Sequence, residues 1–86
     1  MQTYEPLVET LRVLPNQLFG AFVERRRMQL RMTSSEAADL AGLPFSIWVS
    51  IETGWHSELS DEVVFSVART LEVTADLIRW MSAIND

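Results

Sequence analysis

The sequence predicts an all-α protein, folded as one compact bundle of five or six helices. Two observations favour this class. Apolar residues recur at three- and four-residue spacing along most of the chain, and capping residues and glycines divide these runs into short helices. No run of residues makes a credible strand. With 86 residues, of which 48% are hydrophobic and 22% charged, the chain is expected to form a single domain over residues 1–86.

The first expected helix spans residues 6–14. Pro6 suits a first helical turn, and Pro15 ends the run. Its apolar residues at helical spacing are Leu7, Val8, Leu11 and Leu14. This helix could cover the core, which we place within residues 16–84, or form the seam of a homodimer. The spacing does not decide between the two.

A second helix is predicted to follow Asn16, which can cap it, and to end near Arg31. Its apolar stripe consists of Leu18, Phe19, Phe22, Val23 and Leu30. The third helix begins at Ser34, because Thr33 and Glu36 stand at the spacing of a capping box. Gly42 is placed to end this helix in a left-handed conformation, and Leu43 can pack back on it.

Pro44 is expected to open a fourth helix that turns Ile47, Trp48 and Ile51 inward, with Gly54 ending it. Two short helices joined by a tight turn that contains a glycine are typical of a helix-turn-helix. The sequence therefore predicts this motif over the third and fourth helices.

The last two helices follow a loop over residues 55–59. Ser60 can cap the first of them, and the acidic Asp61 and Glu62 complement its N-terminal dipole. Its expected inward residues are Val64, Phe65, Val67, Ala68 and Leu71. Thr74 can cap the final helix, with Trp80 to one side. The residues that this final helix is expected to bury are Leu77, Ile78, Met81 and Ile84.

Two segments carry a resemblance to a known family: MTSSEAADLAGLPFSIWVSIETG at residues 32–54 and VARTLEVTADLI at residues 67–78. From Phe19 to Trp80 the chain resembles the Cro/CI (XRE) family of helix-turn-helix repressor domains. The framework positions of that family are matched by Ala38, Leu40, Ala41, Gly42, Leu43, Trp48, Ile51, Glu52 and Gly54. The resemblance implies a lambda-repressor-like fold, a structural pair between Arg27 and Glu52, and a role in transcription.

The positions that touch DNA in that family are where the chain departs from it. They hold Ser34, Phe45, Ser46, Val49 and Ser50. Reading bases in the major groove relies above all on Arg, Asn and Gln, and none of these occurs between Ser34 and Ser50. The loop that often carries basic residues in the family is aromatic and acidic instead, with Trp55, His56, Ser57 and Glu58.

Phe45 and Val49 stand four residues apart and are therefore expected to share the outward face of the fourth helix. Trp55 could extend this apolar pair across the loop. An exposed apolar patch on a small domain is typical of a protein-binding surface. The alternative is that Phe45 folds back over the turn and Trp55 covers the core.

Charge also disfavours DNA as the ligand. Seven arginines and no lysine stand against 12 carboxylates, giving a formal net charge of -5. Because duplex DNA repels such a body, binding would need a local basic patch. Arg25, Arg26 and Arg31 could contact phosphates or an acidic partner. A solvated helix face with pairs such as Glu24 and Arg27 is the plainer interpretation.

An enzyme is not expected. Without cysteine there is no thiol chemistry, and His56 is the only histidine, with no second ligand or nucleophile placed beside it. The serines are most simply caps and turn residues. No cofactor or metal is expected, no segment is apolar enough for a membrane span, and a cytoplasmic protein is the expectation.

Two hypotheses for function follow. In the first, the domain regulates transcription by binding another protein, as small antiactivators of bacterial regulators do, and its former DNA-reading face makes the contact. The residues assigned to that contact are Phe45, Val49, Trp55, Ser46, Ser50, Ser34 and His56. In the second, the chain is an XRE-type repressor or antitoxin-like regulator that dimerises and binds an operator, with short hydroxyls and helix N-termini on the DNA.

Overall fold

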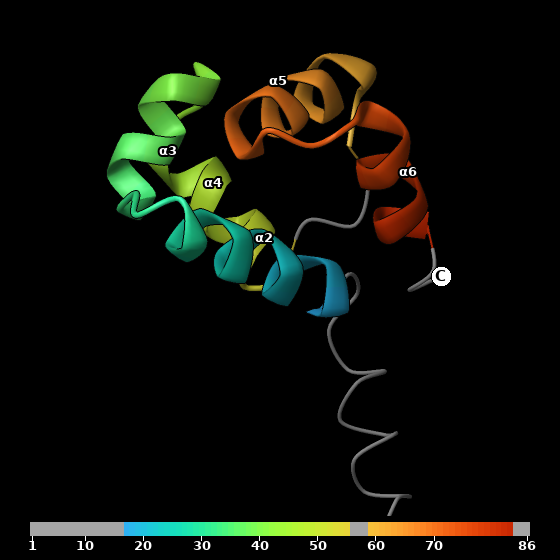
Figure 1. Cartoon of the computed structure of the whole chain (residues 1–86), viewed down its shortest axis with the longest axis horizontal. Helices are drawn as coiled ribbons and strands as arrows, with labels where there is room; N and C mark the ends of the chain where they lie inside the picture. Colours follow the sequence, from blue (N-terminus) through green and yellow to red (C-terminus); the bar gives the residue numbers. More distant parts are fainter. Residues whose placement is uncertain (1–16, 56–58, 84–86) are drawn as a thin grey trace, which may run out of the picture.

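A computed structural model describes residues 17–55 and 59–83, which form five α-helices and no strand (Figure 1). The helices are α2 (Gln17–Gln29), α3 (Ser34–Ala41), α4 (Phe45–Glu52), α5 (Asp61–Leu71) and α6 (Ala75–Ala83). This confirms the all-α class, with a helix count inside the predicted range. The expected helix over residues 6–14, the Asn16 cap, residues 56–58 and Ile84 lie outside the described residues.

The helices surround one core. Helix α2 packs on α4, α3 packs on both α4 and α5, and α5 packs on α6, which also touches α2. Figure 1 shows α3 and α4 at one end of the molecule and α6 at the other. Every helix contributes to the buried apolar cluster of Phe19, Val23, Ala37, Ala38, Ala41, Trp48, Ile51, Val64, Val67, Ala68, Leu71 and Ile78. The core is therefore built from residues 19 to 78, within the predicted range.

Both ends of α3 are set by the predicted local signals. The Thr33 hydroxyl accepts a hydrogen bond from the Glu36 amide at 3.0 Å, and the Glu36 carboxylate accepts one from the Thr33 amide at 2.8 Å. Gly42 then adopts a left-handed conformation with φ of 71°. Leu43 follows it and packs against the core. The capping box and the glycine stop are thus confirmed.

The caps of α5 and α6 are also confirmed. The Ser60 hydroxyl accepts from the Val63 amide at 3.3 Å, and the Thr74 hydroxyl accepts from the Leu77 amide at 3.1 Å. Helix α4 begins differently, since Pro44 stands just before it and offers no side-chain hydrogen bond. The first turn of α4 therefore has no side-chain cap and no acidic residue.

Helices α2 and α4 approach closely at Gly20, which is buried. A Cβ atom at this position would lie 2.5 Å from the backbone oxygen of Glu52 and 2.7 Å from that of Ile51. These distances are far shorter than van der Waals contact, and the obstacle is backbone that cannot rotate away. The absence of a side chain at position 20 consequently sets how α2 lies against the end of α4.

Two residues expected to face inward do not. Phe65 is 54% exposed, because Val64, Val67, Ala68 and Leu71 already form the inner face of α5 and Phe65 projects to the side. The Arg79 guanidinium lies 5.1 Å from the centre of its ring. Leu18 is 47% exposed, since the inner face of α2 is formed by Phe19 and Val23. The inward placement of both residues was wrong.

Candidate functional site

The inner face of α4 is anchored by a buried polar network. The Glu52 carboxylate accepts hydrogen bonds from Arg27 Nε at 2.6 Å and from the buried Trp48 Nε1 at 2.5 Å. Arg27 also donates to the Met32 carbonyl at 2.8 Å, and the Ser34 hydroxyl reaches Glu52 at 3.5 Å. The expected Arg27–Glu52 pair is therefore present and joins α2 to α4, and the Ser34 contact connects α3 to the same network.

The outer face of α4 has a different character. Phe45 in its first turn is 56% exposed, and Trp55, three residues after the helix, is 68% exposed. The Trp55 amide donates to the Ser50 carbonyl at 2.9 Å, which places this residue directly at the end of α4. Val49 is half-buried, so it contributes only part of its side chain to the predicted apolar pair. We call Phe45, Ser46, Val49, Ser50 and Trp55 the α4 surface.

The hydroxyl groups proposed to contact a ligand are not equally available. Ser46 is exposed on the first turn of α4. Ser50 is half-buried and donates to the Ile47 carbonyl of its own helix at 2.7 Å. Ser34 is half-buried and turned toward Glu52. Within the α4 surface, Ser46 is therefore the hydroxyl best placed to meet a ligand, and His56 lies outside the described residues.

Helices α3 and α4 contribute no basic side chain of their own, although Arg69 of α5 reaches the end of α3 and donates to the Leu40 carbonyl at 3.2 Å. The sequence contains no lysine or arginine between Met32 and Ala68, a stretch that includes all of α3 and α4. Among the arginines predicted to contact phosphate or an acidic partner, Arg26 makes hydrogen bonds within the protein. Its Nε donates to the Leu71 carbonyl at 2.9 Å and its Nη1 to Gln29 at 3.3 Å. Arg25 and Arg31 are exposed on or just after α2.

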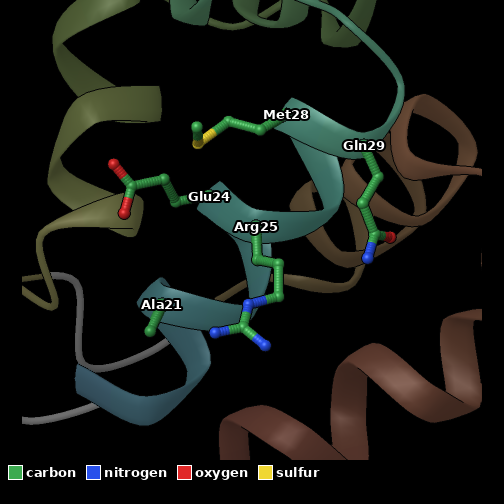
Figure 2. Close-up of a pocket in the computed structure, with 5 residues that line it drawn as sticks. All are labelled: Ala21, Glu24, Arg25, Met28 and Gln29. Carbon is green, nitrogen blue, oxygen red and sulfur yellow. The ribbon is translucent and has the colours of Figure 1, made fainter.

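A surface hollow of about 540 Å³ runs along the outer side of α2 (Figure 2). The described residues that line it are Ala21, Glu24, Arg25, Met28 and Gln29. All of them come from one stripe of this helix, and Glu24 and Arg25 bring opposite charges to it. The described lining includes no serine, threonine, lysine or histidine.

Within residues 17–55 and 59–83, no three histidine or acidic side chains gather as a metal site would require. None of the described helices combines the length and apolarity needed to cross a bilayer. Comparison with family models, with curated proteins and with solved structures gives no match for this chain.

Proposed function

We propose that this chain is a Cro/CI-type helix-turn-helix domain that regulates transcription by binding another protein. The motif would consist of α3 and α4, joined over residues 42–44. The α4 surface makes the contact, and the bound protein is a transcription regulator whose activity is blocked. One observation carries the proposal: Phe45 and Trp55 are exposed where the family resemblance places polar and basic DNA contacts.

Exposed aromatic residues of this kind are effective anchors. Tryptophan and other aromatic side chains dominate the binding energy of many protein interfaces when they enter apolar pockets of the partner. Burial stabilises the complex by roughly 25 cal/mol for each Å² of apolar surface removed from water. Phe45 and Trp55 would be the anchors, the exposed part of Val49 would lie between them, and Ser46 would form part of the polar rim.

The charge distribution suits a regulator as the partner. DNA-binding regulators carry basic surfaces, and a chain with net charge -5 and no basic residue between Met32 and Ala68 attracts such a surface. Binding to that basic surface would cover the part of the regulator that contacts DNA. The chain would act in the cytoplasm by steric exclusion, without catalysis or a cofactor.

The second candidate is an XRE-type repressor or antitoxin-like regulator that binds DNA. The start of α4 favours it, because the first turn has no side-chain cap and carries the exposed Ser46. Free backbone amides at a helix N-terminus and a short hydroxyl can both bind a phosphate. Arg25 and Arg31 would then have to supply the remaining phosphate contacts.

The variant Phe45→Asp separates the two candidates. Protein binding is measured by isothermal titration with purified regulators encoded near the gene, and DNA binding by fluorescence anisotropy with its upstream DNA. Met28→Asp is the matched control, since Met28 is exposed to a similar extent, 61% against 56%, but lies on α2, outside the α4 surface. We expect native protein and Met28→Asp to bind one regulator, and Phe45→Asp to lose at least about tenfold in affinity.

Circular dichroism of each variant checks that the fold is intact. An acidic residue in the first turn of a helix is favourable, so Phe45→Asp should fold normally. Tight, salt-sensitive binding of the native protein to the upstream DNA, weakened by Arg25→Ala or Arg31→Ala, would overturn the protein-binding proposal and support the second candidate.

A further inference from the structure

A second exposed aromatic surface lies on α5 and α6, away from α4. Phe65 on α5 and Trp80 on α6 are 54% and 60% exposed. Arg79 of α6 links the two helices, because its guanidinium lies 5.1 Å from the centre of the Phe65 ring on α5. Trp80 is the next residue after Arg79 in the chain. We call Asp61, Phe65, Asp76, Arg79 and Trp80 the α5–α6 surface.

The exposed positions of α6 form one continuous stripe. Asp76, Arg79, Trp80 and Ala83 are all exposed and follow the three- and four-residue spacing of one helix face. The adjoining exposed side of α5 carries Asp61 and, four residues on, Phe65. Figure 1 shows α6 at the opposite end of the bundle from α3 and α4. A partner on α6 would therefore lie away from α3 and from helix α4.

Carboxylates outnumber guanidinium groups here. Arg79 lies 3.5 Å from a carboxylate oxygen of Asp61 and 3.6 Å from one of Asp76, so one cation serves two acidic side chains. Those side chains are 80% and 97% exposed, and Glu62 beside them is also exposed. Most of their hydrogen-bonding capacity consequently faces water, and the surface keeps a negative charge next to its aromatic rings.

The negative charge of the α5–α6 surface determines which kind of partner can bind to it. In a symmetric dimer the same patch meets its own copy across a two-fold axis, so two surfaces that are both net negative would face each other. Like charges facing each other oppose association. A segment with lysine or arginine beside apolar residues is complementary instead. Its cations can pair with the carboxylates and lie over Trp80, as Arg79 lies over Phe65.

We propose that the α5–α6 surface binds a basic amphipathic helix of a partner protein, independently of the α4 surface. The apolar side of that helix covers Phe65 and Trp80, and its lysine or arginine residues pair with Asp61 and Asp76. The domain then has two separate protein-binding surfaces and can hold one partner at α4 while it is attached to another.

The test uses the full chain and a 14-residue helical peptide made only of leucine and lysine. Amide and indole signals are followed by two-dimensional NMR as the peptide is added. We expect shifts at residues 61–65 and 76–80 and at the Trp80 indole, with the buried Trp48 indole unmoved. Trp80→Ala should weaken binding about tenfold, and Asp76→Asn several-fold, with less dependence on salt.

Two controls keep the outcomes distinct. A peptide of leucine and glutamate should not bind, and Trp55→Ala, which removes the exposed indole beside α4, should leave the affinity unchanged. Shifts confined to Phe45 and Trp55 would overturn the proposal while leaving the function proposed for α4 intact. A native dimer that Trp80→Ala converts to a monomer, measured by analytical ultracentrifugation, would overturn it too.

Discussion

The two faces of α4 differ although they belong to one eight-residue helix. On the inner face, Trp48 and Ile51 are buried and Glu52 accepts hydrogen bonds from two other side chains at 2.6 Å or less. On the outer face, Phe45 is more than half exposed. The inner face is therefore determined by packing and by charge pairing. The exposed Phe45 ring contributes little packing to the described fold, which is why we propose that it contacts an external partner.

The largest effect expected on the inner face comes from Trp48→Ala. It removes a fully buried ring and the indole donor to Glu52, and large-to-small changes of this kind cost about 4 kcal/mol. Chemical unfolding followed by circular dichroism measures the loss. Ser46→Ala on the outer face should change the free energy of unfolding by less than about 0.5 kcal/mol. Equal losses in the two variants would remove the contrast between the faces.

The Arg27–Glu52 pair should give the next effect. Arg27→Leu leaves the Glu52 carboxylate, whose side chain is only 9% exposed, without its cation and should cost about 3 kcal/mol. The double variant Arg27→Leu/Glu52→Leu should cost clearly less than the sum of the single changes, because no unpaired charge remains. A double-mutant cycle in urea measures this. Additive losses would show that the pair is not coupled.

Gly20→Ala is expected to cost about 2 kcal/mol, since the new methyl group would meet the backbone oxygens of Ile51 and Glu52. The informative result is whether Gly20→Ala lowers or raises the free energy of unfolding. In an exposed helix position the same change stabilises a protein by about 1 kcal/mol. Thermal unfolding of the single variant decides it, and a higher melting temperature would mean that α2 and α4 are not in close contact here.

The smallest effect belongs to the outer face. Phe45→Asp should leave the free energy of unfolding within about 0.5 kcal/mol of the native value, with any change toward higher stability. The ring loses little packing, and the new carboxylate lies at the positive end of the helix dipole. A loss above about 2 kcal/mol would place Phe45 in the core and refute its role as a binding residue.

The parts of the fold that local chemistry determines could be predicted from the sequence. The Thr33 and Glu36 capping box and the left-handed Gly42 depend on neighbours within four residues, and periodicity located Trp48 and Ile51 on the inner face of α4. Phe65 could not be placed in the same way. Helical spacing allowed it on the edge of the inner face, and the position of Arg79 on another helix, which decides its surroundings, is not visible in a local pattern.

Long-range contacts limit the prediction of the candidate site as well. The outward position of Phe45 followed from the helix period, but the half-buried state of Val49 depends on how neighbouring segments cover α4. Arg26 was assigned to phosphate or an acidic partner because arginines gather in that segment. Its bond to the Leu71 carbonyl joins residues 45 positions apart, which no spacing rule within one helix could reveal.

That same bond has a consequence for how the molecule opens. The last turn of α5 and the last turn of α2 share a hydrogen bond that forms only when both helices are in place. Local unfolding of α5 therefore withdraws a partner from α2, and the two segments should open as one cooperative unit. In native-state hydrogen exchange, the amides around Arg26 and Leu71 should respond together as denaturant is added.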